Sequence, residues 1–146
     1  MPYLLRATLI ALALLTTVSC SSKRMVTPDR TLNASIQSDR GQMQQAIVKA
    51  LVGRGWTVQK ITPQLVQAQI TVREQFHAQI DIPYSANHYQ IVYRDSSGLD
   101  FKEGKIHKNY IRWVRLLDRD IVRDLKDNQN ERTAKQLSEA ALAKPQ

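Results

Sequence analysis

The feature that most constrains the fold is a regular alternation of apolar and polar residues between positions 66 and 94. Apolar side chains occupy every second position in three consecutive segments, 66–72, 76–84 and 89–94. This is the period of β-strands that have one buried face and one wet face. The alternation therefore predicts three half-buried antiparallel strands in succession, and the apolar segment 56–61 supplies a fourth.

The registers of these strands follow from placing apolar residues opposite apolar residues. A three-residue loop at 73–75, between the strands at 66–72 and 76–84, sets Ile70 opposite Ala78. A two-residue turn at 85–86 sets Ile80 opposite Ile91. The predicted registers then give one continuous apolar face across the sheet.

A helix is predicted on each side of these strands. Asp39 and Gln42 have the spacing of a capping box, and apolar residues then recur at intervals of three and four until Gly53 or Gly55 ends the helix. A second helix begins near 107–109. Its apolar stripe has the spacing of one helix face and consists of Tyr110, Trp113, Val114, Leu117, Ile121 and Leu125.

These elements predict an α+β fold. We expect a two-layer sandwich in which a four-stranded antiparallel meander carries one helix before it and one after it, both packed on one face. The domain occupies residues 38–127. Residues 20–37 are polar and aperiodic and contain Pro28, which predicts a flexible tether. Residues 128–146 form a polar C-terminal tail that is either helical or disordered.

The first residues have the pattern of an export signal. Arg6 precedes the apolar run 7–15, and small and polar residues lead to Cys20, the only cysteine. The run is shorter than the roughly 20 apolar residues of a spanning helix, which predicts a cleaved signal peptide at 1–19. The order Thr17, Val18, Ser19, Cys20 resembles the lipobox of bacterial lipoproteins, with Thr17 where a leucine is usual.

The resemblance implies a lipid anchor at Cys20. In that family the cysteine carries several acyl chains such as palmitate, whereas one chain alone would bind a bilayer only reversibly. Ser21 follows where an aspartate would favour the inner membrane, which implies the periplasmic face of the outer membrane. The alternative is that Cys20 is an ordinary residue of a simple secretory signal, or a buried thiol.

A second resemblance lies in the body of the chain. The segment 93–96, followed by 106–110 and then by Trp113 and Val114, is similar to a pattern in small uncharacterised bacterial envelope lipoproteins. It implies the same location in the envelope and carries over no activity.

The chain is basic, with 21 Lys and Arg against 13 Asp and Glu. Helical spacing predicts ion pairs of Arg115 with Asp118 and of Arg123 with Asp127. In an exported protein this charge argues against nucleic acid as a partner. It predicts attraction to anionic headgroups or an acidic partner, or else it only keeps the surface solvated. The basic face of the second helix is formed by Arg112, Arg115, Arg119 and Arg123.

The three histidines do not converge in the predicted register. His77 and His88 fall about 20 Å apart along the hairpin, whereas zinc lies about 2 Å from its ligand atoms, so we expect no metal site. Residues 95–98, Asp-Ser-Ser-Gly, are predicted to form a turn. His107 is predicted to cap the second helix or to contact that turn. The alternative is a polar recognition site made by Asp95, Ser96, His107, Asn109 and Tyr110.

The sequence contains no nucleophile motif, phosphate loop or HExxH pattern, so we expect neither an enzyme nor a bound cofactor. The leading hypothesis is an outer-membrane-anchored periplasmic lipoprotein that acts as a non-catalytic interaction or accessory module. Its partners would be the membrane, through Cys20, and a protein of the cell envelope. The alternative is a small-ligand or glycan-binding domain that uses a polar cleft near His107 and Tyr110.

Overall fold

The computed structural model describes residues 21–143 and shows an α+β fold. The predicted signal peptide at 1–19, Cys20 and residues 144–146 lie outside the described residues. In chain order the elements are β1 (Ser22–Arg24), β2 (Asp29–Thr31), α2 (Arg40–Gly53), β3 (Thr57–Thr62), β4 (Leu65–Val72), β5 (Phe76–Pro83), β6 (His88–Gln90), β7 (Val92–Ser97), β8 (Lys105–His107) and α3 (Lys108–Leu142).

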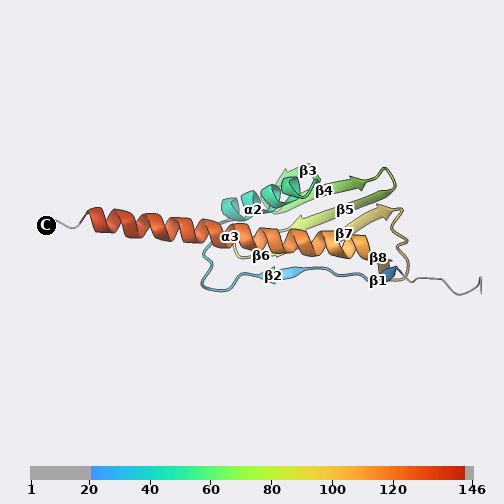
Figure 1. Cartoon of the computed structure of the whole chain (residues 1–146), viewed down its shortest axis with the longest axis horizontal. Helices are drawn as coiled ribbons and strands as arrows, with labels where there is room; N and C mark the ends of the chain where they lie inside the picture. The colour runs from blue at the N-terminus through green and yellow to red at the C-terminus, as the bar shows by residue number, and fades with distance from the viewer. Residues whose placement is uncertain (1–20, 144–146) are drawn as a thin grey trace, which may run out of the picture.

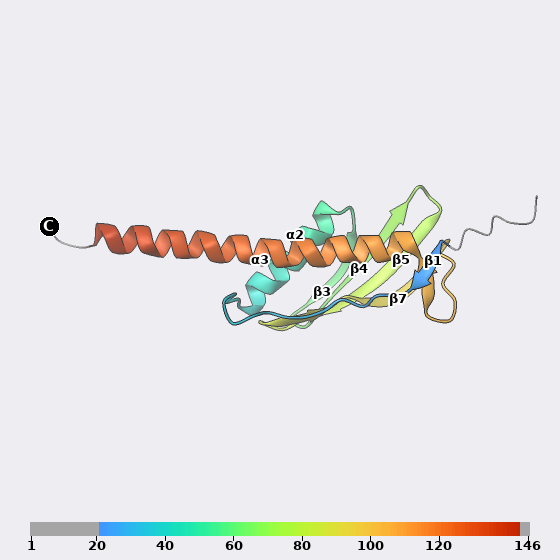
Figure 2. The ribbon, with the colours of Figure 1, turned by 60° about the horizontal axis from the view of Figure 1, so that its bottom comes forward.

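The main sheet has four antiparallel strands in the order β3-β4-β5-β7. Both helices lie on the same face of this sheet, and no helix covers the other face in the described part of the chain (Figures 1 and 2). The predicted two-layer sandwich is therefore confirmed. Two small sheets complete the fold, β1 with β8 and β2 with β6.

The first helix begins and ends where the sequence predicts. The Asp39 side chain accepts a hydrogen bond of 2.8 Å from the backbone N–H of Gln42. The Gln42 side chain in turn accepts one of 3.0 Å from the backbone N–H of Asp39. This capping box satisfies two donors at the start of α2, which ends at Gly53 and buries the predicted stripe of Met43, Ala46, Ile47, Ala50 and Leu51.

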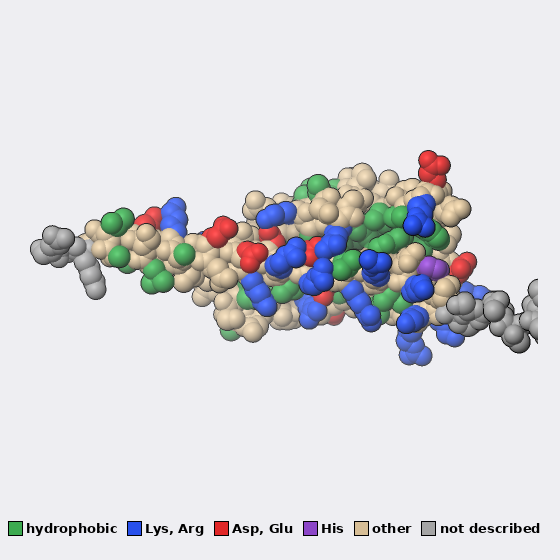
Figure 3. Space-filling view, viewed as in Figure 1, with side chains coloured by type: hydrophobic (Ala, Val, Ile, Leu, Met, Phe, Trp, Pro, Cys, Tyr) green, Lys and Arg blue, Asp and Glu red, His purple; other side chains and the backbone are tan. Residues whose placement is uncertain are grey.

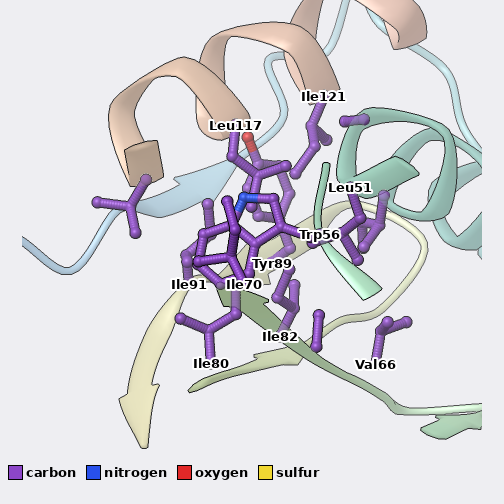
Figure 4. Close-up of a cluster of buried hydrophobic side chains, with 14 of the residues drawn as sticks. Leu51, Trp56, Val66, Ile70, Ile80, Ile82, Tyr89, Ile91, Leu117 and Ile121 are labelled. Atoms are coloured by element: carbon purple, nitrogen blue, oxygen red, sulfur yellow. The ribbon is translucent and has the colours of Figure 1, made fainter. Parts of the chain in front are cut away.

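The core lies between the main sheet and the two helices. Figure 4 shows Trp56 and Tyr89 surrounded by aliphatic side chains of the strands and of both helices. Trp56, Tyr89 and Tyr110 are buried. Three further aromatic side chains are only partly buried against it: Phe76, Tyr93 and Trp113.

The register of β4 against β5 is confirmed, with Ile70 opposite Ala78. The register of β5 against β7 is wrong by two residues at Ile80, which lies opposite Tyr93 and not Ile91. Beyond an irregularity between Gln79 and Ile80 it is wrong by three, because Ala78 lies opposite Ser96. The connection is a four-residue turn, in which the Ser85 N–H donates to the His88 carbonyl at 2.8 Å. A shift by two leaves the side chains of residues 89–93 on their predicted faces.

The predicted strand at 89–94 is divided into two strands. His88–Gln90 pairs with β2, and the backbone N–H of Ile91 donates to the Pro28 carbonyl at 2.8 Å. The chain then enters the main sheet as β7, which continues through Asp95 to Ser97. The predicted turn at 95–98 is therefore wrong, since its first three residues pair with β5 and its polar character reflects a strand at the edge of the sheet.

The predicted tether at 20–37 is wrong for its described part. Residues 22–24 pair with β8 and residues 29–31 pair with β6. Such short strands show no sequence period, but their pairing satisfies backbone groups that would otherwise need water. Four apolar side chains of this segment also pack against the core: Met25, Val26, Leu32 and Ile36.

The second helix begins at Lys108, as predicted, and continues through the predicted tail to Leu142. Its 35 residues span about 52 Å at 1.5 Å per residue. Residues 133–142, which we call the helical arm, follow Arg132, whose side chain donates to the Gln37 carbonyl at 2.6 Å. This end of α3 extends beyond the rest of the domain (Figure 1). Of the two alternatives for 128–146, the structure shows the helical one as far as Leu142.

Candidate functional site

His107 caps the second helix, as one of the two sequence interpretations predicts. Its ring Nδ1 accepts a hydrogen bond of 3.2 Å from the backbone N–H of Asn109. The imidazole also stacks on Phe76, with 5.8 Å between the ring centroids. The His107 ring is therefore engaged in capping and stacking, and it satisfies the backbone N–H of Asn109.

The proposed recognition cluster is not assembled as predicted. Tyr110 is fully buried, and burial raises the pKa of its hydroxyl, so its ring belongs to the core and cannot line a surface cleft. Asp95 and Ser96 instead line a hollow of about 340 Å³ on the sheet together with His77. The predicted cleft near His107 and Tyr110 is therefore wrong, because one stripe of α3 that carries Tyr110 faces inward.

The uncovered face of the main sheet carries a network of polar side chains that bond to one another. Arg94 on β7 donates to Asp81 at 3.0 Å and to Gln79 at 3.1 Å, both on β5. Gln67 on β4 donates to the same Asp81 oxygen at 3.0 Å. Arg94 also bonds to Gln59 on β3. The result is a surface suited to hydrogen bonding with a partner, without an activated nucleophile among these groups.

The predicted basic face of the second helix is exposed to solvent. Figure 3 shows Lys and Arg side chains spread along the face of the molecule that α3 forms. The four predicted arginines, Arg112, Arg115, Arg119 and Arg123, are all exposed. Two of them lie near the carboxylate of Asp120, Arg119 at 3.8 Å and Arg123 at 3.1 Å.

Three of the four aspartates of this helix are buried, whereas Asp127 is exposed. Asp118, Asp120 and Asp124 are buried and pair with cations of other elements. Arg30 of β2 donates to Asp118 at 2.6 Å, while Arg54 bonds to Asp120. Lys49 of α2 likewise bonds to Asp124. The predicted pairs within α3 are therefore wrong, and the arginines keep more of their positive potential than the sequence suggests.

The pH dependence of stability tests the contact between Arg54 and Asp120. The hydrogen bond from Arg54 holds the pKa of Asp120 below its ordinary value, although burial acts to raise it. Such a carboxylate stabilises the fold above its unfolded pKa of about 3.9, and the contribution is lost as pH falls through the lower folded pKa. We expect Asp120→Asn to cost about 1–3 kcal/mol near pH 7.

Urea denaturation of both proteins at about pH 7 and about pH 3 measures this effect. The difference between wild type and Asp120→Asn should shrink at the lower pH. Asp127→Asn, at an exposed position on the same helix, is the matched control and should change stability little at either pH. An equal cost of Asp120→Asn at both values would contradict the assignment.

The three histidines have separate surroundings. His77 bonds to Thr71 at 2.9 Å, and His88 lies 2.6 Å from Asp29. Within residues 21–143, no three His, Cys, Asp or Glu side chains converge in a way that could hold a metal ion. Neither helix of that range combines the length and the apolar character needed to cross a membrane.

Sequence reasoning missed a group of cations at the end of the domain where β1 meets β8. The group includes Arg24, Lys102 and Lys105, all of them exposed. One sequence signal could have predicted this group. Gly104 favours a tight hairpin turn at Glu103 and Gly104, and such a turn would bring Lys102 and Lys105 side by side.

The chain matches no protein-family model, and no curated protein matches it.

Proposed function

We propose that the chain is an outer-membrane-anchored periplasmic lipoprotein that acts as a non-catalytic interaction module. The single observation that carries the proposal is the position of Ser21, whose carbonyl accepts a hydrogen bond of 3.0 Å from the backbone N–H of Lys108. Ser21 is one peptide bond from Cys20. A lipid on Cys20 would therefore attach at the end of the domain where α3 begins.

The helical arm leaves the domain at the opposite end of α3 (Figures 1 and 2). An anchored molecule would then hold its basic end near the bilayer and carry the arm into the periplasm. The arm exposes large apolar side chains, with Leu137 at 67% and Leu142 at 84% exposure. Ala134, Leu137 and Ala141 recur at intervals of three and four, which is the spacing of a helix face that docks to a partner.

Site-specific photo-crosslinking in cells tests this proposal. A photoreactive residue at Leu137 should capture an envelope protein, because that position lies on the apolar stripe of the arm. The matched control is Val52 on α2, which is 64% exposed against 67% for Leu137. We expect adducts from Leu137 well above those from Val52.

The anchor is tested in the same cells. Cys20→Ala should abolish metabolic lipid labelling and should reduce the adducts of Leu137, because the unanchored chain no longer lies at the membrane. Lipid labelling that persists in Cys20→Ala would overturn the anchor. Equal adduct yields from Leu137 and Val52 would overturn the role of the arm.

A further inference from the structure

Three cations form a row across the end of the domain where β1 and β8 pair. Arg24 lies directly opposite Lys105, and Lys105 lies opposite Lys102 in an antiparallel bridge. Two backbone hydrogen bonds of 2.9 Å join Lys102 and Lys105. Glu103 and Gly104 between them both have positive φ, as a two-residue hairpin turn requires. We call Arg24, Lys102 and Lys105 the cationic row.

The cationic row points away from the core. Ile106 is fully buried, so the alternation of a strand turns its neighbour Lys105 outward. Residues directly opposite one another in an antiparallel pair share a face, which turns Arg24 and Lys102 outward as well. All three side chains are exposed, and Figure 3 shows cationic side chains gathered at this end of the molecule.

The charges of the row are not neutralised within the described residues. Like charges directly opposite one another destabilise an antiparallel pair, and no ion pair in residues 21–143 joins the row to a carboxylate. Lys23 and Lys108 are two further exposed cations at this end. The cations there outnumber the two nearby acids, Asp100 and Glu103. An anionic surface would offset the repulsion.

The backbone fixes the row beside the start of the described chain. Ser21 bonds to Lys108, and the Met25 N–H donates to the Gly104 carbonyl at 2.8 Å. Ser22 pairs with His107 between these two contacts. Backbone hydrogen bonds therefore join the row to the first residue after Cys20, and no unpaired spacer separates them within the described residues.

We propose that the cationic row binds the phosphate headgroups of anionic phospholipids in the leaflet that would hold the lipid of Cys20. The inference rests on the proposed function and adds a defined orientation, with the β1–β8 sheet on the headgroups and the helical arm directed away from them. Each basic side chain close to an anionic bilayer favours binding by roughly fivefold, so three cations together have a large effect on orientation.

Energy transfer in vesicles tests the orientation with the mature lipidated protein. The lipid would block the thiol of Cys20, the only cysteine, so Thr27→Cys supplies a single site for a fluorophore next to β1. Vesicles of phosphatidylcholine, alone or mixed with phosphatidylglycerol, carry an acceptor on a headgroup. We expect phosphatidylglycerol to raise the transfer efficiency at low salt, and high salt to reverse the rise because it screens the charges.

The decisive variant replaces Arg24, Lys102 and Lys105 with glutamine and should lose the response to phosphatidylglycerol. Its melting temperature should equal or exceed that of wild type, since repulsion is removed. The matched control makes the same change at three exposed lysines elsewhere, Lys60, Lys126 and Lys135, and should keep the response. Equal responses from the two triple variants, or none from wild type, would overturn the inference.

Mass spectrometry of the same samples separates this inference from the proposed function. A mature chain without lipid on Cys20 overturns the anchor. Sedimentation of that unlipidated chain with the two kinds of vesicle then decides the role of the row, because binding that depends on phosphatidylglycerol and on the row supports it, and its absence overturns it.

Discussion

Replacing Tyr89 with alanine should lower the free energy of unfolding by about 3–5 kcal/mol. Tyr89 is fully buried, so the change leaves a cavity between the helices and the sheet (Figure 4). Its hydroxyl also donates to Asp118 at 2.8 Å, and it lies directly opposite Arg30 in the pairing of β2 with β6. The substitution therefore also weakens the attachment of β2.

Chemical denaturation in urea and hydrogen exchange together measure the two parts of this effect. The midpoint of unfolding reports the lost packing, and exchange of the Ile91 N–H, which bonds to Pro28, reports the attachment of the N-terminal segment. We expect faster exchange at Ile91 in Tyr89→Ala than in wild type under native conditions.

Tyr89→Phe is the control that separates packing from hydrogen bonding. It keeps the ring and removes one donor from the buried Asp118 carboxylate, which should cost about 1–3 kcal/mol. Tyr93→Ala provides a second comparison at a half-buried aromatic and should cost less than Tyr89→Ala. A Tyr89→Ala protein that unfolds at the urea midpoint of wild type would contradict this account.

Sequence periodicity was sufficient where an element carries a long pattern. The stripe from Met43 to Leu51 and the capping box at Asp39 predicted α2 with its buried residues. The eight-residue strands β4 and β5 predicted their own register, because a slip by one residue would expose every apolar side chain. In these elements local pattern and tertiary packing favour the same structure.

The remaining errors come from partners that are distant in the sequence. β1 and β2 are three residues long, so their structure is set by β8 and β6 and not by any period of their own. Asp118 pairs with Arg30, 88 residues earlier, and no local spacing predicts that. The turn propensity at 95–98 yields to backbone pairing with β5, which is decided by the whole sheet.

The candidate site was predictable only in its surface charge. The exposed arginines of α3 follow from helical geometry alone. The cluster at His107 and Tyr110 failed because Tyr110 lies on the buried stripe of α3, where it packs edge-on against Tyr93 with 5.7 Å between ring centroids. The cationic row required the β1–β8 pairing, which brings residues 24 and 105 together.

Gly98→Ala, directly after the last residue of β7, should be among the more damaging single substitutions. Gly98 has φ +73, and an added Cβ would lie 2.0 Å from the backbone carbonyl oxygen of Gln75. That oxygen belongs to the loop before β5, so relief of the contact must displace the backbone and not a flexible side chain. A positive φ alone costs about 1–2 kcal/mol for a residue with a Cβ, and we expect a total loss of about 2–4 kcal/mol.

Gly55→Ala is the matched control for this prediction. Gly55 has φ +79, but nothing lies within 4 Å of its added Cβ, so it should show only the conformational cost of about 1–2 kcal/mol. Urea denaturation of both variants isolates the steric contribution as their difference. If the two variants lost equal stability, the close approach of Gly98 to Gln75 would not constrain the end of β7. A larger loss in Gly98→Ala would show that this contact fixes where β7 leaves the sheet, and hence where the chain turns toward β8.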